Sequence, residues 1–394
     1  MIDPTRLRRS WTFWAAAVWL APIVVVTVMV ALDPTKRSVL TLYHTASQAW
    51  WDEKSLYTGA GGMNYFPQFA ILFAPFHALG RPWGDIAWRW LSAGLLIAGW
   101  LQILREMNRR ETARLFFWSS ALGIAACLAA IRNGQANAML AAMMVNAAAF
   151  LMRERWRLAA LCLVGALVSK PLGVVMLLLA PVVYRPLTVP LAVTAAAFLV
   201  APFAFGAPQY VLSQYRDVGQ NLQACLVMAE HRFADINGIF RTLGAELPRL
   251  VAVPLRGVAG LGALWLWRRT ARLAEPLRGA FLLALAASYL MLFNPMNEEN
   301  SYVILAPAAA VMAIYFLQVD PRPRAGRVMA AAIFTIGVLP ESFRHLDRKF
   351  ALWWDPLMTI VFIAAVLACV LPQRRETLPA TKEALPMPTA GAQS

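Results

Sequence analysis

Apolar segments of helical length alternate with polar loops along this chain of 394 residues, and every second loop is rich in arginine. A helix needs roughly 20 residues to cross the hydrocarbon of a bilayer. The segments that reach or approach this length are residues 11–31, 83–104, 115–131, 136–152, 158–170, 171–184, 187–205, 250–267, 277–293, 301–317, 328–339 and 353–371. The sequence therefore predicts an all-α fold, a polytopic bundle of about 11–13 transmembrane helices in a lipid bilayer.

The amino-acid composition supports a membrane protein. Hydrophobic residues make up 60% of the chain and charged residues 14%, whereas soluble domains contain roughly 25% charged residues. The net charge of +15 would suit nucleic acid, but the arginines lie in short loops beside apolar runs, so no nucleic-acid partner is expected. The four cysteines lack paired spacing, and the sequence has no Gly-rich phosphate loop, so we expect no metal and no cofactor.

Arginine placement predicts the orientation in the membrane. Basic residues precede the first span, and arginine clusters return after every second span. Since cytoplasmic loops carry an excess of lysine and arginine, we expect a multi-pass protein of the inner (plasma) membrane with both termini in the cytoplasm. Residues 1–10 would then form a cytoplasmic N-terminus, residues 11–371 the membrane domain, and residues 372–394 a disordered cytoplasmic tail.

Two long outer segments, residues 32–82 and 206–249, contain many of the unusual polar residues. Within the first, residues 43–51 are rich in aromatic residues and are expected to form an amphipathic helix at the membrane interface. Residues 66–79 are apolar and are expected either to re-enter the membrane or to pack on the bundle. Together the two segments are expected to roof a cavity on the outer face.

Lys170 is the clearest candidate for a binding residue. It ends an apolar run, and Pro171 breaks the helix immediately after it. The segments on either side are too short to cross alone, so we expect half-helices that meet at an interior site. A charge within the membrane is a functional candidate, and this ammonium would bind a lipid phosphate. The alternative is a lysine that extends from a helix end toward the membrane surface.

The sequence Arg132-Asn133-Gly134-Gln135 joins two apolar spans through a tight outer turn. Gly134 permits the reversal of the chain. The Arg132 guanidinium suits a phosphate, and the amides of Asn133 and Gln135 suit sugar hydroxyls. The alternative is an ordinary polar turn.

Four outer carboxylates are candidates for a general base. Asp52 and Glu53 follow two tryptophans, which would raise the pKa of a neighbouring carboxyl group by desolvation. Trp50 and Trp51 would also stack on a sugar ring. The alternative is an interfacial aromatic belt followed by solvated acids. Glu298 and Glu299 lie in a second outer turn.

The amides of that second turn, Asn297 among them, suit recognition of a polyol or a cation. His231, Arg232 and His345 are further phosphate candidates in outer loops. The alternative for these three is an ordinary solvated side chain.

The chain resembles glycosyltransferase family 87, because several short motifs occur in it in the same order as in that family. They are Tyr43-x-x-Ala46-x-x-Ala49-Trp50, Leu56-Tyr57, Asn64-Tyr65-Phe66-Pro67, Phe73-Ala74-Pro75, Asn133-Gly134-Gln135-Ala136-Asn137 and Ser169-Lys170-Pro171. The resemblance implies a GT-C-like fold and a polyprenol-dependent enzyme. Such an enzyme moves a hexose, such as mannose, from a polyprenyl-phosphate sugar to a lipid or glycan acceptor outside the membrane. It also adds Tyr43, Tyr65 and Asn137 to the substrate-binding candidates.

The chain departs from the family pattern at two positions. The family usually carries an aspartate shortly before the tyrosine matching Tyr43, but residues 37–42 contain no acid. The histidine expected in the late outer turn is replaced by Asn297-Glu298-Glu299. We therefore take Asp52, Glu53, Glu298 and Glu299 as candidate catalytic residues, with Asp52 first. The alternatives are a lipid or solute transporter (a flippase included) and an inactive relative that binds lipid-linked sugar.

Overall fold

All regular secondary structure in the described part of the chain is helical, which confirms the predicted fold class. The computed structural model describes residues 4–57, 63–227, 233–294, 296–343, 345–347 and 349–371. The elements are α1 (Pro4–Leu32), α2 (Leu40–Trp51), α3 (Pro67–Ala78), α4 (Trp83–Met107), α5 (Thr112–Asn133), α6 (Ala136–Met152), α7 (Trp156–Ser169), η1 (Pro171–Gly173), α8 (Val174–Val183), η2 (Arg185–Leu187), α9 (Thr188–Val200), η3 (Ala201–Ala204), α10 (Pro208–Val227), α11 (Ile236–Thr242), α12 (Arg249–Arg269), η4 (Thr270–Arg272), α13 (Leu277–Phe293), η5 (Glu299–Ile304), α14 (Ala306–Ile314), η6 (Tyr315–Val319), α15 (Pro323–Phe343) and α16 (Phe350–Val370).

The predicted apolar segments coincide with helices of the bundle. Within the described ranges, seven helices are long and apolar enough to cross a membrane: α1, α4, α5, α9 with its flanking turns, α12, α15 and α16. Shorter apolar helices account for the other predicted segments. The chain is thus a polytopic helical bundle, and the number of helices that cross the bilayer stays a prediction.

The centre of the bundle is built around α6 and α13, which are buried on nearly every side. A helix that is apolar all round needs neighbours on all faces. The alanines of α6 allow close packing, and at Gly99 of α4 an added Cβ would lie 2.7 Å from the Asn146 side chain. The N-terminal end of α6, which carries Asn137, is therefore held rigidly inside the molecule.

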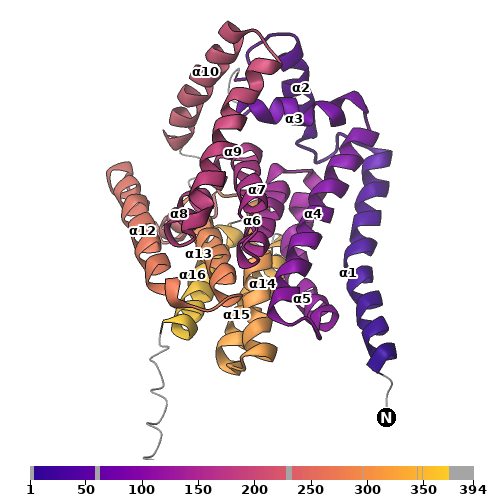
Figure 1. Ribbon diagram of the computed structural model, residues 1–394, viewed down its shortest axis with the longest axis vertical. Helices are drawn as coiled ribbons and strands as arrows, with labels where there is room; N and C mark the ends of the chain where they lie inside the picture. Colours follow the sequence, from indigo (N-terminus) through magenta and orange to yellow (C-terminus); the bar gives the residue numbers. More distant parts are fainter. Residues whose placement is uncertain are drawn as a thin grey trace, which may run out of the picture.

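Helices α2, α3 and α10 gather at one end of the molecule, and we call them the cap (Figure 1). The start of α1 and the end of α16 lie at the opposite end (Figure 1). Residues 67–78 pack on α2 and α4, in line with one of the two expectations for this stretch. Aromatic contacts among Tyr43, Phe69, Phe73 and Trp88 stabilise this packing.

The two long outer segments contact each other through hydrogen bonds. Tyr210 Oη donates to the Lys54 carbonyl oxygen at 2.8 Å, and the Leu56 amide donates to Gln214 Oε1 at 3.0 Å. Asn221 Nδ2 donates to the Met63 carbonyl at 3.2 Å. Lys54, Leu56 and Met63 of the first segment therefore contact α10 of the second, whereas α11 of the second segment packs on α16.

The predicted helix break at Lys170 is present. Helix α7 ends at Ser169, Lys170 is extended with φ −160°, and η1 starts at Pro171. The Gly173 amide then donates to the Lys170 carbonyl at 2.9 Å. Proline lacks the amide hydrogen that would continue α7, so the break follows from the sequence and directs the lysine out of the helix.

Candidate functional site

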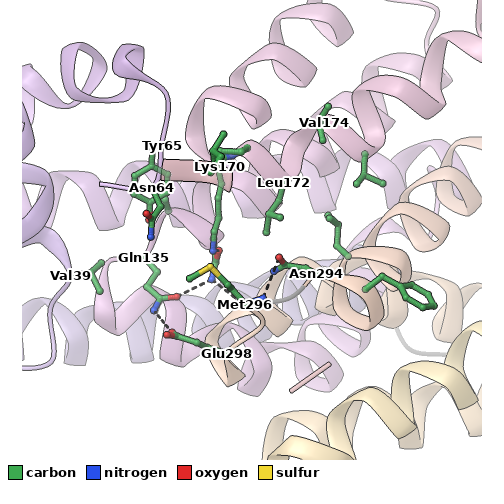
Figure 2. Close-up of a pocket in the computed structure, with 18 of the residues that line it drawn as sticks. Val39, Asn64, Tyr65, Gln135, Lys170, Leu172, Val174, Asn294, Met296 and Glu298 are labelled. Carbon is green, nitrogen blue, oxygen red and sulfur yellow. Dashed lines mark hydrogen bonds between the residues drawn. The ribbon is translucent and has the colours of Figure 1, made fainter. Parts of the chain in front are cut away.

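A cavity of about 560 Å³ lies between the cap and the centre of the bundle. Its apolar wall includes Leu172, Val174 and Met296 (Figure 2). Polar side chains line the rest, namely Asn64, Tyr65, Gln135, Asn137, Lys170, Arg256, Asn294, Glu298 and Ser301. An apolar enclosure with a few convergent polar groups is typical of a small-molecule or lipid site.

A line of hydrogen bonds crosses this cavity from a cation to a carboxylate (Figure 2). Lys170 Nζ donates to Asn137 Oδ1 at 2.8 Å, and Asn137 Nδ2 donates to Gln135 Oε1 at 2.9 Å. Gln135 Nε2 then donates to Glu298 Oε2 at 3.3 Å. The structure thus brings together four of the predicted site residues, which lie on the α7–η1 break, at the start of α6 and beside η5.

The tight turn before α6 positions this line. Helix α5 ends at Asn133, and Gly134 has φ +66°, a conformation that favours glycine. An added Cβ there would also lie 2.9 Å from the Leu40 side chain. The Gly134 carbonyl accepts a hydrogen bond from Trp88 Nε1 at 2.9 Å. Leu40 and Trp88 therefore hold the turn in place. Gln135, which follows it, lines the cavity.

Tyr43 and Tyr65 line the cavity from the cap side. Tyr43 Oη accepts a hydrogen bond from the Ala136 amide at 3.0 Å and lies 3.0 Å from Tyr65 Oη. The first turn of a helix has amides without an intrahelical partner. Tyr43 therefore caps α6 while joining the cap to the line of hydrogen bonds.

Arg132 and Asn133 lie outside the main cavity. They line a neighbouring hollow of about 430 Å³, to which Gln135 and Glu298 also contribute. The sequence Arg132–Gln135 is therefore divided between two adjacent spaces, and only its last residue lies beside Lys170.

Asp52 and Glu53 do not line the main cavity. The Lys54 ammonium, at 3.0 Å, and Gln48, whose Nε2 donates at 2.8 Å, lower the pKa of Asp52. This is contrary to the expected increase, because the tryptophans point elsewhere. Trp50 is buried against Phe205, and the side chain of Trp51 is 50% exposed.

Asn297 and Glu299 also lie apart from the main cavity. Asn297 is fully buried, and its Nδ2 donates to the carbonyls of Leu290 and Met291 at 2.8 and 2.6 Å. Contrary to the expectation of a substrate contact, it donates to carbonyls in the last turn of α13. Glu299 lines a different cavity, and His345 is exposed. The expected phosphate-binding residues His231 and Arg232 fall outside the described residues.

Arg256 lines the cavity but escaped the sequence analysis, whereas Asn294, which also lines it, is one of the amides of the predicted second turn. Arg256 lies within α12, in a segment predicted to cross the membrane, and its carbonyl accepts a hydrogen bond from Tyr289 Oη at 3.1 Å. A charged residue inside an apolar span indicates a functional site, and the position of Arg256 within such a span can be read from the sequence. With Lys170 and Glu298, the described residues that line the cavity include two cations and one carboxylate.

A second polar cluster lies where α2 and α3, which belong to the cap, meet α4. His44 Nε2 contacts Asp85 Oδ1 at 2.7 Å, and His77 Nε2 contacts Gln48 Oε1 at 3.0 Å, so each Nε2 carries a hydrogen. The two Nδ1 atoms lie 3.1 Å apart, so one of them donates to the other. The pair lies beside Asp85, and Arg81 Nε lies 3.7 Å from the same carboxylate.

Protonation of His77 is expected to destabilise the cap. Burial, and then the neighbouring His44, lower the pKa of His77. A histidine with a lowered folded-state pKa contributes stability above its unfolded value of about 6.5 and loses it as the pH falls through the folded value. We predict that the thermal midpoint of the detergent-solubilised protein falls with acidification below about 6.5, and that His77→Gln flattens this dependence. An identical fall in His77→Gln would assign the effect to other groups.

A family model described as glycosyltransferase family 87 matches residues 64–295, which is more than half of the chain. The matched range contains Gln135, Asn137, Lys170 and Arg256, whereas Tyr43 and Glu298 lie outside it. No curated protein matches the chain.

Proposed function

The chain belongs to glycosyltransferase family 87, and we propose that it transfers a hexose, such as mannose, from a polyprenyl-phosphate sugar to a lipid or glycan acceptor. The observation that carries this proposal is the line of hydrogen bonds from Lys170 to Glu298 across the main cavity. It supplies a cation for a departing phosphate, amides for sugar hydroxyls and a carboxylate for the acceptor.

Lys170 and Arg256 serve the donor in this proposal. The leaving group is a lipid phosphate, whose negative charge grows as the bond to the anomeric carbon breaks. Cations held in an enclosed, largely apolar site stabilise such charge more strongly than they would in water. The apolar wall near Leu172 and Val174 suits the first units of the polyprenyl chain.

Glu298 serves the acceptor. Its carboxylate takes the proton of the acceptor hydroxyl while that oxygen attacks the anomeric carbon. The carbon–oxygen bond to the phosphate breaks, the bonding electrons leave with the polyprenyl phosphate, and the configuration inverts. Gln135 and Asn137 hold the sugar between the two charged ends, and the Ser301 hydroxyl, 3.3 Å from Asn137 Nδ2, supports that amide.

A comparison of donors tests the proposal. The purified protein would be supplied with membrane lipids and with the same radiolabelled hexose carried either on polyprenyl phosphate or on a nucleotide. We expect transfer to lipid from the polyprenyl donor alone. Equal transfer from the nucleotide sugar would contradict the assigned donor, and donor binding without sugar transfer would favour an inactive binding protein.

The orientation is a further prediction. We place the cap outside the membrane and both termini in the cytoplasm, since arginine clusters such as residues 153–157 mark cytoplasmic loops. Single cysteines would be introduced at position 52, in the cap, and at position 155, at the opposite end. A membrane-impermeant thiol reagent applied to intact cells is expected to label position 52 only. Labelling of position 155 with protection of position 52 would invert the topology.

A further inference from the structure

A second cavity, of about 480 Å³, lies between α1, α5, α15 and α16. It is formed mostly by parts of the chain outside residues 64–295, the range of the family match, with α5 as the exception. Pro22, Val25 and Met29 of α1 form much of its apolar side. Val25 and Met29 are 57% and 46% exposed, so this side faces the bilayer when α1 spans it.

The other end of this second cavity is polar and acidic. Asp355 of α16, Glu341 of α15 and Glu299 line it, with Arg132 as the cation. Asp355 is 1% exposed, and its Oδ1 has no hydrogen-bond partner among the described residues. Buried carboxylate oxygens rarely remain without a donor, so this atom points to a ligand that donates a hydrogen bond.

The chemistry of this end restricts the ligand. A carboxylate accepts hydrogen bonds, as a phosphate oxygen does, and among the described lining residues the acids outnumber the bases. A lipid with a phosphate at this position would therefore meet repulsion. A neutral headgroup with several hydroxyls would satisfy Asp355 and leave its apolar part against α1.

Element η5 separates the second cavity from the main one. Glu298 and Ser301 line the main cavity, whereas Glu299 and Tyr302 line the second. The smaller hollow between them shares Glu298 with the main cavity and Arg132 with the second. A ligand headgroup at Asp355 therefore has a neighbouring space through which a hydroxyl reaches toward Glu298.

Building on the proposed function, we propose that the second cavity binds the acceptor, and that the acceptor is an amphipathic lipid with a neutral, polyhydroxylated headgroup. A hydroxyl of the headgroup donates to Asp355 Oδ1, and the apolar part lies between α1 and α15. The acceptor enters sideways from the bilayer, while the lipid-linked donor occupies the main cavity. Asp355 is a binding and positioning residue in this arrangement, and Glu298 remains the base.

Photolabelling tests this site without any need for turnover. The protein, reconstituted in nanodiscs, would be exposed to an alkyl glucoside with a diazirine in its chain, and to a phosphatidylglycerol with the same group. We expect the glucoside to label α1 and α15 at the second cavity, and the phosphatidylglycerol to label it far less. Asp355→Leu is expected to lower glucoside labelling by about tenfold, and Asp52→Asn, which changes an acid of an ion pair away from this cavity, to leave it unchanged.

A matched pair on α1 keeps the test independent of the folding of Asp355→Leu. Val25→Trp fills the cavity from an exposed position, whereas Val28→Trp changes a position of α1 that is 53% exposed and is not among the lining residues. Only Val25→Trp should block labelling. Equal labelling in both tryptophan variants, or stronger labelling by phosphatidylglycerol, would overturn the inference. Labelling that depends on Asp355 in a protein without transferase activity would support the site and reject the proposed function alone.

Discussion

Replacing Glu298 by glutamine is expected to lower the rate of sugar transfer by roughly two to four orders of magnitude, with little loss of donor binding. Glutamine keeps the size of the side chain and removes its basicity. Glu298 is the acid that lines the main cavity with Lys170 and accepts a hydrogen bond from Gln135. Turnover and donor affinity would be measured separately on the purified protein.

Asp52→Asn is the matched control for this change. Asp52 lies in an ion pair with Lys54, away from the main cavity, so the amide variant is expected to keep near-normal turnover. If Asp52→Asn abolished transfer while Glu298→Gln retained it, the base would belong to the cap and the assignment made here would be wrong.

Replacing Lys170 by alanine is expected to weaken binding of polyprenyl phosphate by roughly ten- to a hundredfold, which corresponds to about 1.5–3 kcal/mol for a charge-assisted hydrogen bond. The variant also removes the donor to Asn137 and so breaks the line of hydrogen bonds. Affinity would be measured with polyprenyl phosphate itself, which isolates the leaving group from the chemistry.

Two companion variants sharpen this measurement. Lys170→Arg is expected to restore affinity only in part, because a guanidinium is planar and larger than an ammonium. Lys54→Ala removes a lysine outside the main cavity and should leave affinity unchanged. Wild-type affinity in Lys170→Ala would mean that another group binds the phosphate. Arg256, which lines the same cavity, would be the alternative.

The sequence predicted the helices well because apolar length and arginine spacing are properties of the chain itself. The break at Lys170 followed from Pro171, and the turn before α6 followed from Gly134. Such local signals need no knowledge of neighbouring helices. The same signals made Lys170 and Gln135 binding candidates, and both line the main cavity although they flank different helices.

The directions of side chains, and the contacts between residues far apart in the chain, could not be predicted from the sequence. Asp52 follows two tryptophans in the chain, but a helix points successive residues in different directions, and Asp52 ends beside Lys54. His44 and His77 are far apart in sequence and meet only because α2 packs on α3.

Two charges were missed although a signal existed. Arg256 and Asp355 both lie in segments predicted to cross the membrane, where an ionisable side chain is costly. Each lines a cavity in the structure. Charged residues inside predicted spans therefore indicate functional sites as strongly as the polar residues of the predicted outer loops do.

The most direct test of the account is a single-turnover reaction of excess purified protein with radiolabelled polyprenyl-phosphate mannose and membrane lipids. We predict that wild-type protein converts the donor to polyprenyl phosphate and mannosylated lipid in equal amounts. Glu298→Gln should bind the donor and leave it intact. If wild-type protein bound the donor, but neither mannose nor any other hexose supplied on polyprenyl phosphate were transferred, the proposed transferase mechanism would be contradicted.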